Sequence, residues 1–160
     1  MTLCHAPLFY WAIRFDKSLT LRLNQTTSYK AITARNSSSM EDVSDVTRLE
    51  SIKSFQSTIS KSEKALAQMS ASGANTTLLE KRLKALYIGL AMLENAWNQR
   101  PHHYTQEELA EARHVLTGLF PSIEKIYAKS KAGTPQKTLL ERRIKAFELA
   151  VQAIDDLYDE

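Results

Sequence analysis

Apolar residues recur every three or four positions along most of the chain after residue 50, which is the spacing of one face of an α-helix. Two segments keep a strict 4-3-4-3-4 step. The first stripe consists of Leu79, Leu83, Leu86, Leu90, Leu93 and Trp97. The second consists of Leu140, Ile144, Phe147, Val151, Ile154 and Tyr158. Residues 52–69 and 109–126 repeat at similar but less regular steps. The pattern therefore predicts four amphipathic helices.

The two regular stripes begin within nearly the same ten residues. TLLEKRLKAL spans residues 77–86, and TLLERRIKAF spans residues 138–147, which lie 61 positions later. The same shift, without gaps, places Glu63 on Glu124 and Ala67 on Ala128. An internal repeat of two halves, each of about 60 residues, is therefore predicted.

Turn and cap signals divide each half into two helices. SASGAN (70–75) and SKAGTPQ (130–136) interrupt the two hairpins at similar places. Within the second loop, Thr134 followed by Pro135 is a typical helix start.

Capping-box spacing, in which a threonine is followed three residues later by a glutamate, marks two further helix starts. These pairs are Thr105 with Glu108, between the halves, and Thr77 with Glu80, at the start of the first repeated decamer. Both threonines are therefore predicted to begin helices.

The predicted fold class is all-α: an antiparallel four-helix bundle built from two duplicated helical hairpins. One half of this size buries too little apolar surface to be stable alone, whereas two halves close a core. We place hairpin 1 at about residues 41–99 and hairpin 2 at about residues 105–159, both within a bundle domain of residues 40–160.

Residues 1–39 form an N-terminal extension of different composition, predicted to be poorly structured. Its apolar run LFYWAI (8–13) is too short to cross a membrane and is followed at once by Arg14. The segment is rich in Ser and Thr and poor in acids, as targeting peptides are. Three interpretations stay open: a true start at Met40, a disordered or loosely docked tail, or a targeting segment.

The charge of the chain is concentrated in this extension. The whole sequence has 21 basic and 18 acidic residues, a net charge of +3 and a pI near 9.0, which by themselves would suggest nucleic acid. Residues 1–39 hold five of the basic residues and one acid, so 16 basic and 17 acidic residues remain for the bundle. A neutral bundle does not favour nucleic-acid binding. The single cysteine, Cys4, fits a reducing compartment, and we expect a cytoplasmic protein.

The sequence contains no glycine-rich phosphate loop, Walker motif or GxSxG element. Glu111 and His114 have the Glu-x-x-His spacing of di-metal bundles, but they flank the apolar stripe, and the last helix has no second motif. We therefore predict no catalytic residue, cofactor or metal, and expect that the protein is not an enzyme. The alternative is a ligand- or metal-binding bundle with enzymatic activity, which requires inward polar groups in the middle of the stripes.

Arg82 and Arg143 occupy matching positions at the edges of the two regular stripes. One interpretation is structural: each forms an interhelical ion pair with Glu80, Glu141 or another acid. The other is functional: the two arginines are paired cations that bind an acidic partner.

Apolar residues also occur outside the stripe in ALYIGLAML (85–93). Tyr87, Ile88 and Ala91 lie on the side of this helix that should be polar, and Leu149 is the equivalent of Ile88 in the last helix. We expect these residues to face outward. They are then covered by the extension or by a sister subunit, or they form a partner-binding surface.

These features predict a small non-enzymatic bundle that presents helix faces to a protein partner or to a second copy, without a transmembrane segment. In architecture the predicted bundle resembles the small bacterial immunity proteins that protect against bacteriocins, which are similar compact antiparallel bundles. The resemblance concerns the fold and implies a bacterial accessory or immunity-type role.

Overall fold

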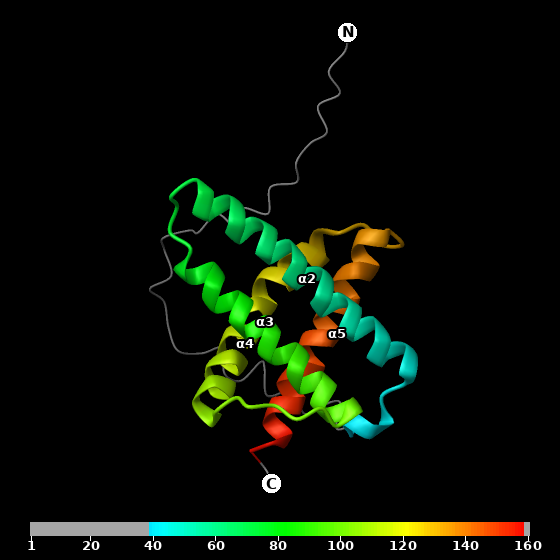
Figure 1. Ribbon diagram of the computed structural model, residues 1–160. Helices are drawn as coiled ribbons and strands as arrows, with labels where there is room; N and C mark the ends of the chain where they lie inside the picture. The colour runs from blue at the N-terminus through cyan, green and yellow to red at the C-terminus, as the bar shows by residue number, and fades with distance from the viewer. Residues whose placement is uncertain (1–38, 159–160) are drawn as a thin grey trace, which may run out of the picture. The chain divides into compact units, whose positions relative to one another are not determined.

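The computed structural model describes residues 39–158, and the elements in that range are helical (Figure 1). A short 3-10 helix, η1 (Met40–Asp42), precedes α2 (Asp45–Ala71), α3 (Thr77–Asn98), α4 (Gln106–Lys129) and α5 (Pro135–Asp156). The predicted all-α four-helix bundle is confirmed for this part of the chain. The prediction of a poorly structured extension concerns residues that, up to residue 38, lie outside the described range.

Two of the predicted helix starts, at Thr105 and Thr134, are confirmed. The Thr105 hydroxyl accepts the Glu108 N–H at 3.2 Å, and the Glu108 carboxylate accepts the Thr105 N–H at 3.1 Å. This reciprocal capping box confirms the start of α4. At the start of α5, the Thr134 hydroxyl accepts the Lys137 N–H at 3.4 Å, and Pro135 occupies the first turn.

The start of α3 differs from the prediction. Thr76, rather than Thr77, precedes the helix, so the expected capping box between Thr77 and Glu80 is wrong. The Asn75 side chain instead accepts the Thr77 N–H at 3.0 Å, and the Thr76 hydroxyl donates to the Glu80 carboxylate at 2.7 Å. An upstream asparagine therefore replaces the threonine cap.

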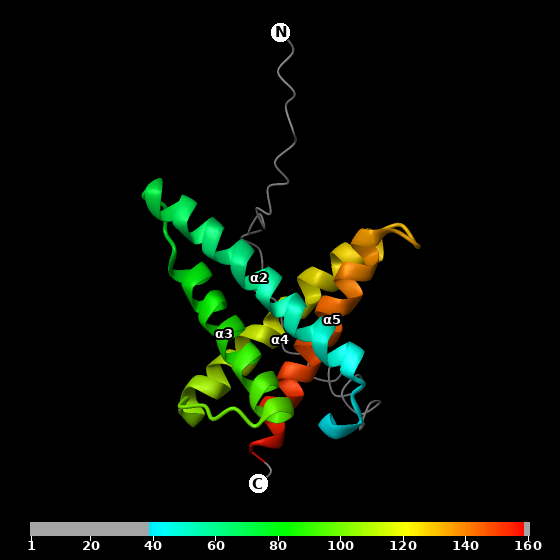
Figure 2. The ribbon, with the colours of Figure 1, turned by 45° about the vertical axis from the view of Figure 1, so that its right-hand side comes forward.

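The two helical hairpins cross each other (Figure 2). Helices α3 and α5 form the inner pair: they pack against each other, and each also packs against both α2 and α4. The backbones of the outer helices α2 and α4 stay farther apart, with no Cα atom of one within 8 Å of a Cα atom of the other. The turn between α2 and α3 and the turn between α4 and α5 point away from each other (Figure 2). Because each inner helix packs against the other three helices, it is contacted from three sides.

Core positions correspond between the hairpins at the shift of 61 residues. The buried pairs are Ser51 and Ala112, Phe55 and Leu116, Ile59 and Phe120, Ala85 and Ala146, Leu86 and Phe147, Ile88 and Leu149, Gly89 and Ala150, Met92 and Ala153, and Leu93 and Ile154. Such a correspondence is what two hairpins of equivalent construction require.

Gly89 lies where side chains of both outer helices reach α3. A Cβ atom at Gly89 would lie 2.8 Å from the ring of Phe55 on α2 and 3.1 Å from a methyl group of Leu116 on α4. The Phe55 ring also packs on Phe147 of α5, with ring centroids 5.1 Å apart. All four helices thus meet around one position that has room only for glycine.

Each hairpin is also closed by an aromatic side chain near its end. The Trp97 indole N–H donates to the Met40 carbonyl at 3.2 Å, which joins η1 to α3. The Tyr158 hydroxyl donates to the Gln106 carbonyl at 2.8 Å, which joins the end of α5 to the start of α4. Trp97 and Tyr158 are again 61 residues apart.

We predict opposite effects of adding a methyl group at the two helical glycines. Gly89→Ala should lower the free energy of unfolding by about 1 kcal/mol, because overpacking a core costs about 1–3 kcal/mol and outweighs the gain in helix propensity. Gly118→Ala should raise it by about 0.5–1 kcal/mol, because the added methyl group meets open space. Urea unfolding followed by circular dichroism measures both changes. A stabilising Gly89→Ala would contradict the close approach of Phe55.

Candidate functional site

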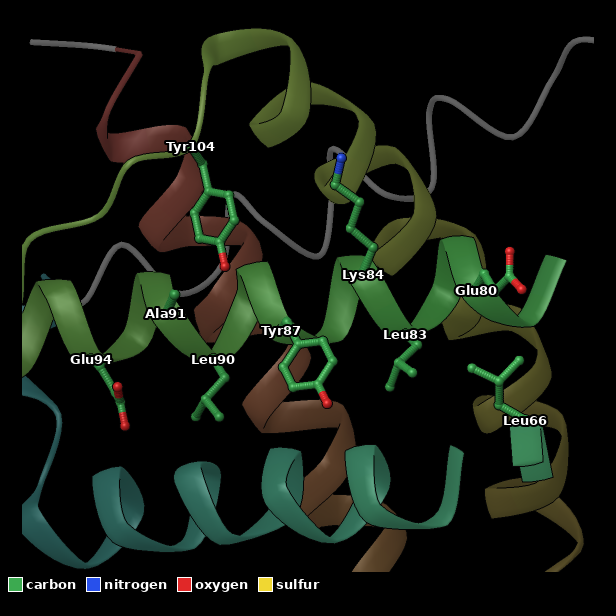
Figure 3. A pocket seen from close by; sticks show the side chains of 9 residues that line it. All are labelled: Leu66, Glu80, Leu83, Lys84, Tyr87, Leu90, Ala91, Glu94 and Tyr104. Carbon is green, nitrogen blue, oxygen red and sulfur yellow. The ribbon is translucent and has the colours of Figure 1, made fainter. Parts of the chain in front are cut away.

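A shallow, open groove of about 570 Å³ runs along one face of α3 (Figure 3). Leu83, Tyr87 and Leu90 point from α3 toward α2 in this view, and Tyr104 hangs over the opposite edge from the segment before α4 (Figure 3). The complete lining is Leu66, Glu80, Leu83, Lys84, Tyr87, Leu90, Ala91, Glu94 and Tyr104. The middle of the groove is apolar, and the charged residues lie toward its ends and rim.

The groove follows from the spacing of residues along α3. Its α3 residues are three or four positions apart and therefore share one helix face. From Glu80 to Glu94 this face is about 21 Å long, at about 1.5 Å per residue. Leu66 on α2 and Tyr104 before α4 complete its lining.

Tyr87 is the most exposed aromatic residue of the groove, with 41% of its surface accessible. Its hydroxyl donates a hydrogen bond to the Glu63 carboxylate on α2, which fixes the ring across the groove. This hydrogen bond, with a further contribution from desolvation, raises the pKa of Tyr87 above its ordinary value. The tyrosine therefore stays neutral at physiological pH and presents its ring as an apolar surface.

The rim of the groove toward α4 is electrically balanced. The Lys84 ammonium lies 2.9 Å from the Glu108 carboxylate. The hydrogen bond between them raises the pKa of Lys84 and lowers that of Glu108, so both groups are charged at neutral pH. Glu94, at the far end, is paired with Arg100 at 3.0 Å.

The end of the groove near Leu66 is acidic. Glu63 accepts its hydrogen bond from the Tyr87 hydroxyl, and Glu80 accepts one from the Thr76 hydroxyl. Both donors are uncharged. Within residues 39–158, no lysine, arginine or histidine nitrogen lies within 4.0 Å of either carboxylate. Two carboxylates, one that contacts Tyr87 and one that lines the groove, therefore have no cationic partner among the described residues.

The equivalent face of α5 has a different chemistry. The residues 61 positions after Leu66, Tyr87 and Ala91 are Tyr127, Glu148 and Gln152. Burial raises the pKa of Glu148, which Lys145 partly opposes. The apolar groove thus belongs to the first hairpin, although the two cores use equivalent positions.

The candidate surface expected from the sequence is brought together only in part. Ile88 is 1% exposed and Leu149 is 3% exposed, so the expectation that these two residues face outward is wrong. The reason is the third contact of each inner helix, which buries positions beyond a single stripe. Tyr87 and Ala91 do line the groove. Leu66, which that surface did not include, lines it from the opposite helix.

Arg82 and Arg143 are both partly buried, and burial lowers the pKa of both guanidinium groups. The two acids proposed as their partners accept hydrogen bonds from hydroxyl groups. Glu80 accepts a hydrogen bond from Thr76, and Glu141 accepts one from the Tyr127 hydroxyl at 2.8 Å.

Among the described residues, three ion pairs join the hairpins: Lys84 with Glu108, and two that are formed by the residues immediately before these arginines. Lys81 on α3 lies 3.4 Å from Glu111 on α4, and Arg142 on α5 lies 2.8 Å from Glu50 on α2. Arg142 follows Lys81 by 61 positions, and Glu111 follows Glu50 by the same number. The two ion pairs are therefore reciprocal, as contacts across an approximate two-fold axis are.

The candidate metal motif is not assembled into a site. Glu111 is paired with Lys81, and His114 is exposed. Within the described residues, no group of three or more His, Cys, Asp or Glu side chains is arranged to hold a metal ion. None of the helices in this range combines the length and apolar character that crossing a membrane requires.

Comparison with known protein families, with curated proteins and with solved structures found no match to this chain. What the groove binds must therefore be inferred from its own shape and charge.

We predict that Ile88→Glu destabilises the bundle instead of altering its surface. The change should lower the free energy of unfolding by at least about 3 kcal/mol, because it removes a buried side chain and places a carboxylate in the core. Ala110→Glu introduces the same carboxylate at an exposed position of α4 and should change stability by less than about 0.5 kcal/mol. Urea midpoints measure both changes, and equal midpoints for the two variants would place Ile88 at the surface.

Proposed function

We propose that this protein is a non-enzymatic interaction protein whose α3 groove receives a helical segment of a partner protein. The observation that carries this proposal is the groove itself, with Leu83, Tyr87 and Leu90 directed into an open apolar strip about 21 Å long. Tyrosine is enriched among residues that dominate binding energy at protein interfaces.

The shape of the groove favours a helical segment over a small molecule. Small-molecule sites usually enclose most of the ligand surface, whereas this groove is shallow and open along its length. An amphipathic helix inserts side chains at i, i+3, i+4 and i+7 into such a strip. A helix of about 14 residues would match its length.

A different protein fits the groove better than a second copy of this chain. Self-association requires an exposed apolar ridge of similar length on the same molecule. Among the described residues, Val46 and Leu49 are exposed on neighbouring positions of α2, but they cover a single helical turn. Leu78 and Leu139 are also exposed, but they lie in the first turns of two separate helices.

The remaining parts of the proposal concern origin and location. The matched core positions and reciprocal ion pairs support a repeat of two hairpins, of which the first carries the binding face. The single cysteine supports a cytoplasmic location. Capture of a toxic protein by an immunity-type bundle is one form of this function, supported by architecture.

We predict that a designed amphipathic peptide binds this groove. The probe is a fluorescein-labelled helix of about 14 residues with leucines on one face and uncharged polar residues elsewhere. Ala91→Arg should weaken its binding by at least about tenfold, because the new side chain fills the groove and places a charge in an apolar contact. Fluorescence anisotropy with the full-length protein measures the affinity.

The matched control for this experiment is Gln152→Arg, which places the same side chain at the equivalent position of α5. It should change the affinity by less than about twofold, because it lies outside the groove. Absence of saturable binding, or equal loss in both variants, would refute the proposal. Light scattering of the unliganded protein tests the second copy as occupant, since a dimer that Ala91→Arg dissociates would replace the partner.

A further inference from the structure

We infer that the partner segment carries one or two lysine or arginine residues at one end of its apolar face, where they meet Glu63 and Glu80. This inference rests on the proposed function, because it concerns the chemistry of the segment that enters the groove. It starts from the uneven charge of the groove, which is acidic near Leu66 and balanced elsewhere. Charge complementarity of this kind fixes the direction and register in which a partner binds.

The carboxylates near Leu66 differ from the other acids around the groove. Glu108 is paired with Lys84, and Glu94 is paired with Arg100. Glu63 and Glu80 accept hydrogen bonds from the neutral hydroxyl groups of Tyr87 and Thr76. A carboxylate accepts several hydrogen bonds, so each of these groups keeps acceptor capacity for a cationic donor.

The second hairpin supplies a cation where the first does not. Lys137 places its ammonium group 4.5 Å from the centroid of the Tyr127 ring, and the Tyr127 hydroxyl donates to Glu141 at 2.8 Å. The residue equivalent to Lys137 in the first hairpin is Thr76, which donates only a hydroxyl group to Glu80. The first hairpin therefore has no lysine at this position, and the hydrogen bond that Glu80 accepts comes from a neutral hydroxyl group.

The geometry also places the cation along the partner. Glu80 and Ala91 are eleven residues apart on α3, which is about 16 Å along the helix axis. A partner helix that lies along the groove should therefore place the basic residue that meets Glu80 about three turns from the residue that covers Ala91. The segment is thus amphipathic, with an apolar face and a basic end.

The test compares three labelled peptides that share the leucine face of the neutral probe. One has two lysines at one end, the second has two glutamates there, and the third has two glutamines. The lysine peptide should bind the full-length protein about tenfold more tightly than the glutamine peptide in about 50 mM salt. The glutamate peptide should bind more weakly than both. The preference should shrink in about 500 mM salt, which screens exposed charges.

Two sets of variants locate the source of the preference. Glu63→Gln with Glu80→Gln removes both charges but keeps an acceptor oxygen for the Tyr87 hydroxyl, so the glutamine peptide should still bind while the lysine preference disappears. Thr76→Lys supplies the cation that the second hairpin has and should reduce the same preference. The matched control, Glu124→Gln with Glu141→Gln, changes the equivalent residues 61 positions later and should leave the preference unchanged.

The outcomes separate this inference from the function on which it rests. If none of the three peptides binds, the proposed function fails. If all three bind equally, or if the lysine preference survives in the Glu63→Gln, Glu80→Gln variant and in Thr76→Lys, the inference is overturned while the groove remains a binding site. Loss of the preference in the control variant as well would also overturn it, because the effect would then follow net charge.

Discussion

The close approach of Phe55 and Leu116 at Gly89 is the constraint on which this bundle depends. Without a side chain at Gly89, the outer helices α2 and α4 both reach the same point of α3. Each outer helix then packs on both inner helices. On another face of the same helix, α3 lines the groove together with Leu66 of α2 and Tyr104. Within the groove Leu83 is buried, whereas Tyr87 is exposed.

Comparison of the two hairpins separates residues that build the fold from residues that distinguish one face. Core positions 61 residues apart remain buried in both hairpins, and the ion pairs of Lys81 and Arg142 are reciprocal. The outer faces differ instead. Leu66 and Thr76 in the first hairpin correspond to Tyr127 and Lys137 in the second. Core positions need matching residues in both hairpins, whereas outer positions do not. The residues that differ between the outer faces therefore indicate the surface on which a function depends.

Periodicity and capping were sufficient to predict four helices and the start of α4 at Thr105. They could not predict the burial of Ile88 and Leu149, because a heptad pattern describes contact with one side of a helix, while the inner helices have three. The groove could not be predicted from the sequence either, because it depends on which part of α3 the other helices leave open. The sequence does contain a signal for the two reciprocal ion pairs. The shift of 61 residues matches Lys81 with Arg142 and also Glu50 with Glu111.

The hydrogen bond from Tyr87 to Glu63 links the apolar and the electrostatic parts of the proposed site. It holds an exposed ring in one orientation before any partner arrives, which reduces the ordering cost of association. The same carboxylate faces the basic end of the proposed segment. Apolar packing on Tyr87 and charge pairing with Glu63 are therefore coupled, and their contributions to affinity should not add independently. Removing the carboxylate without leaving an acceptor releases the ring too, so the charge can be assessed alone only when that hydrogen bond is kept.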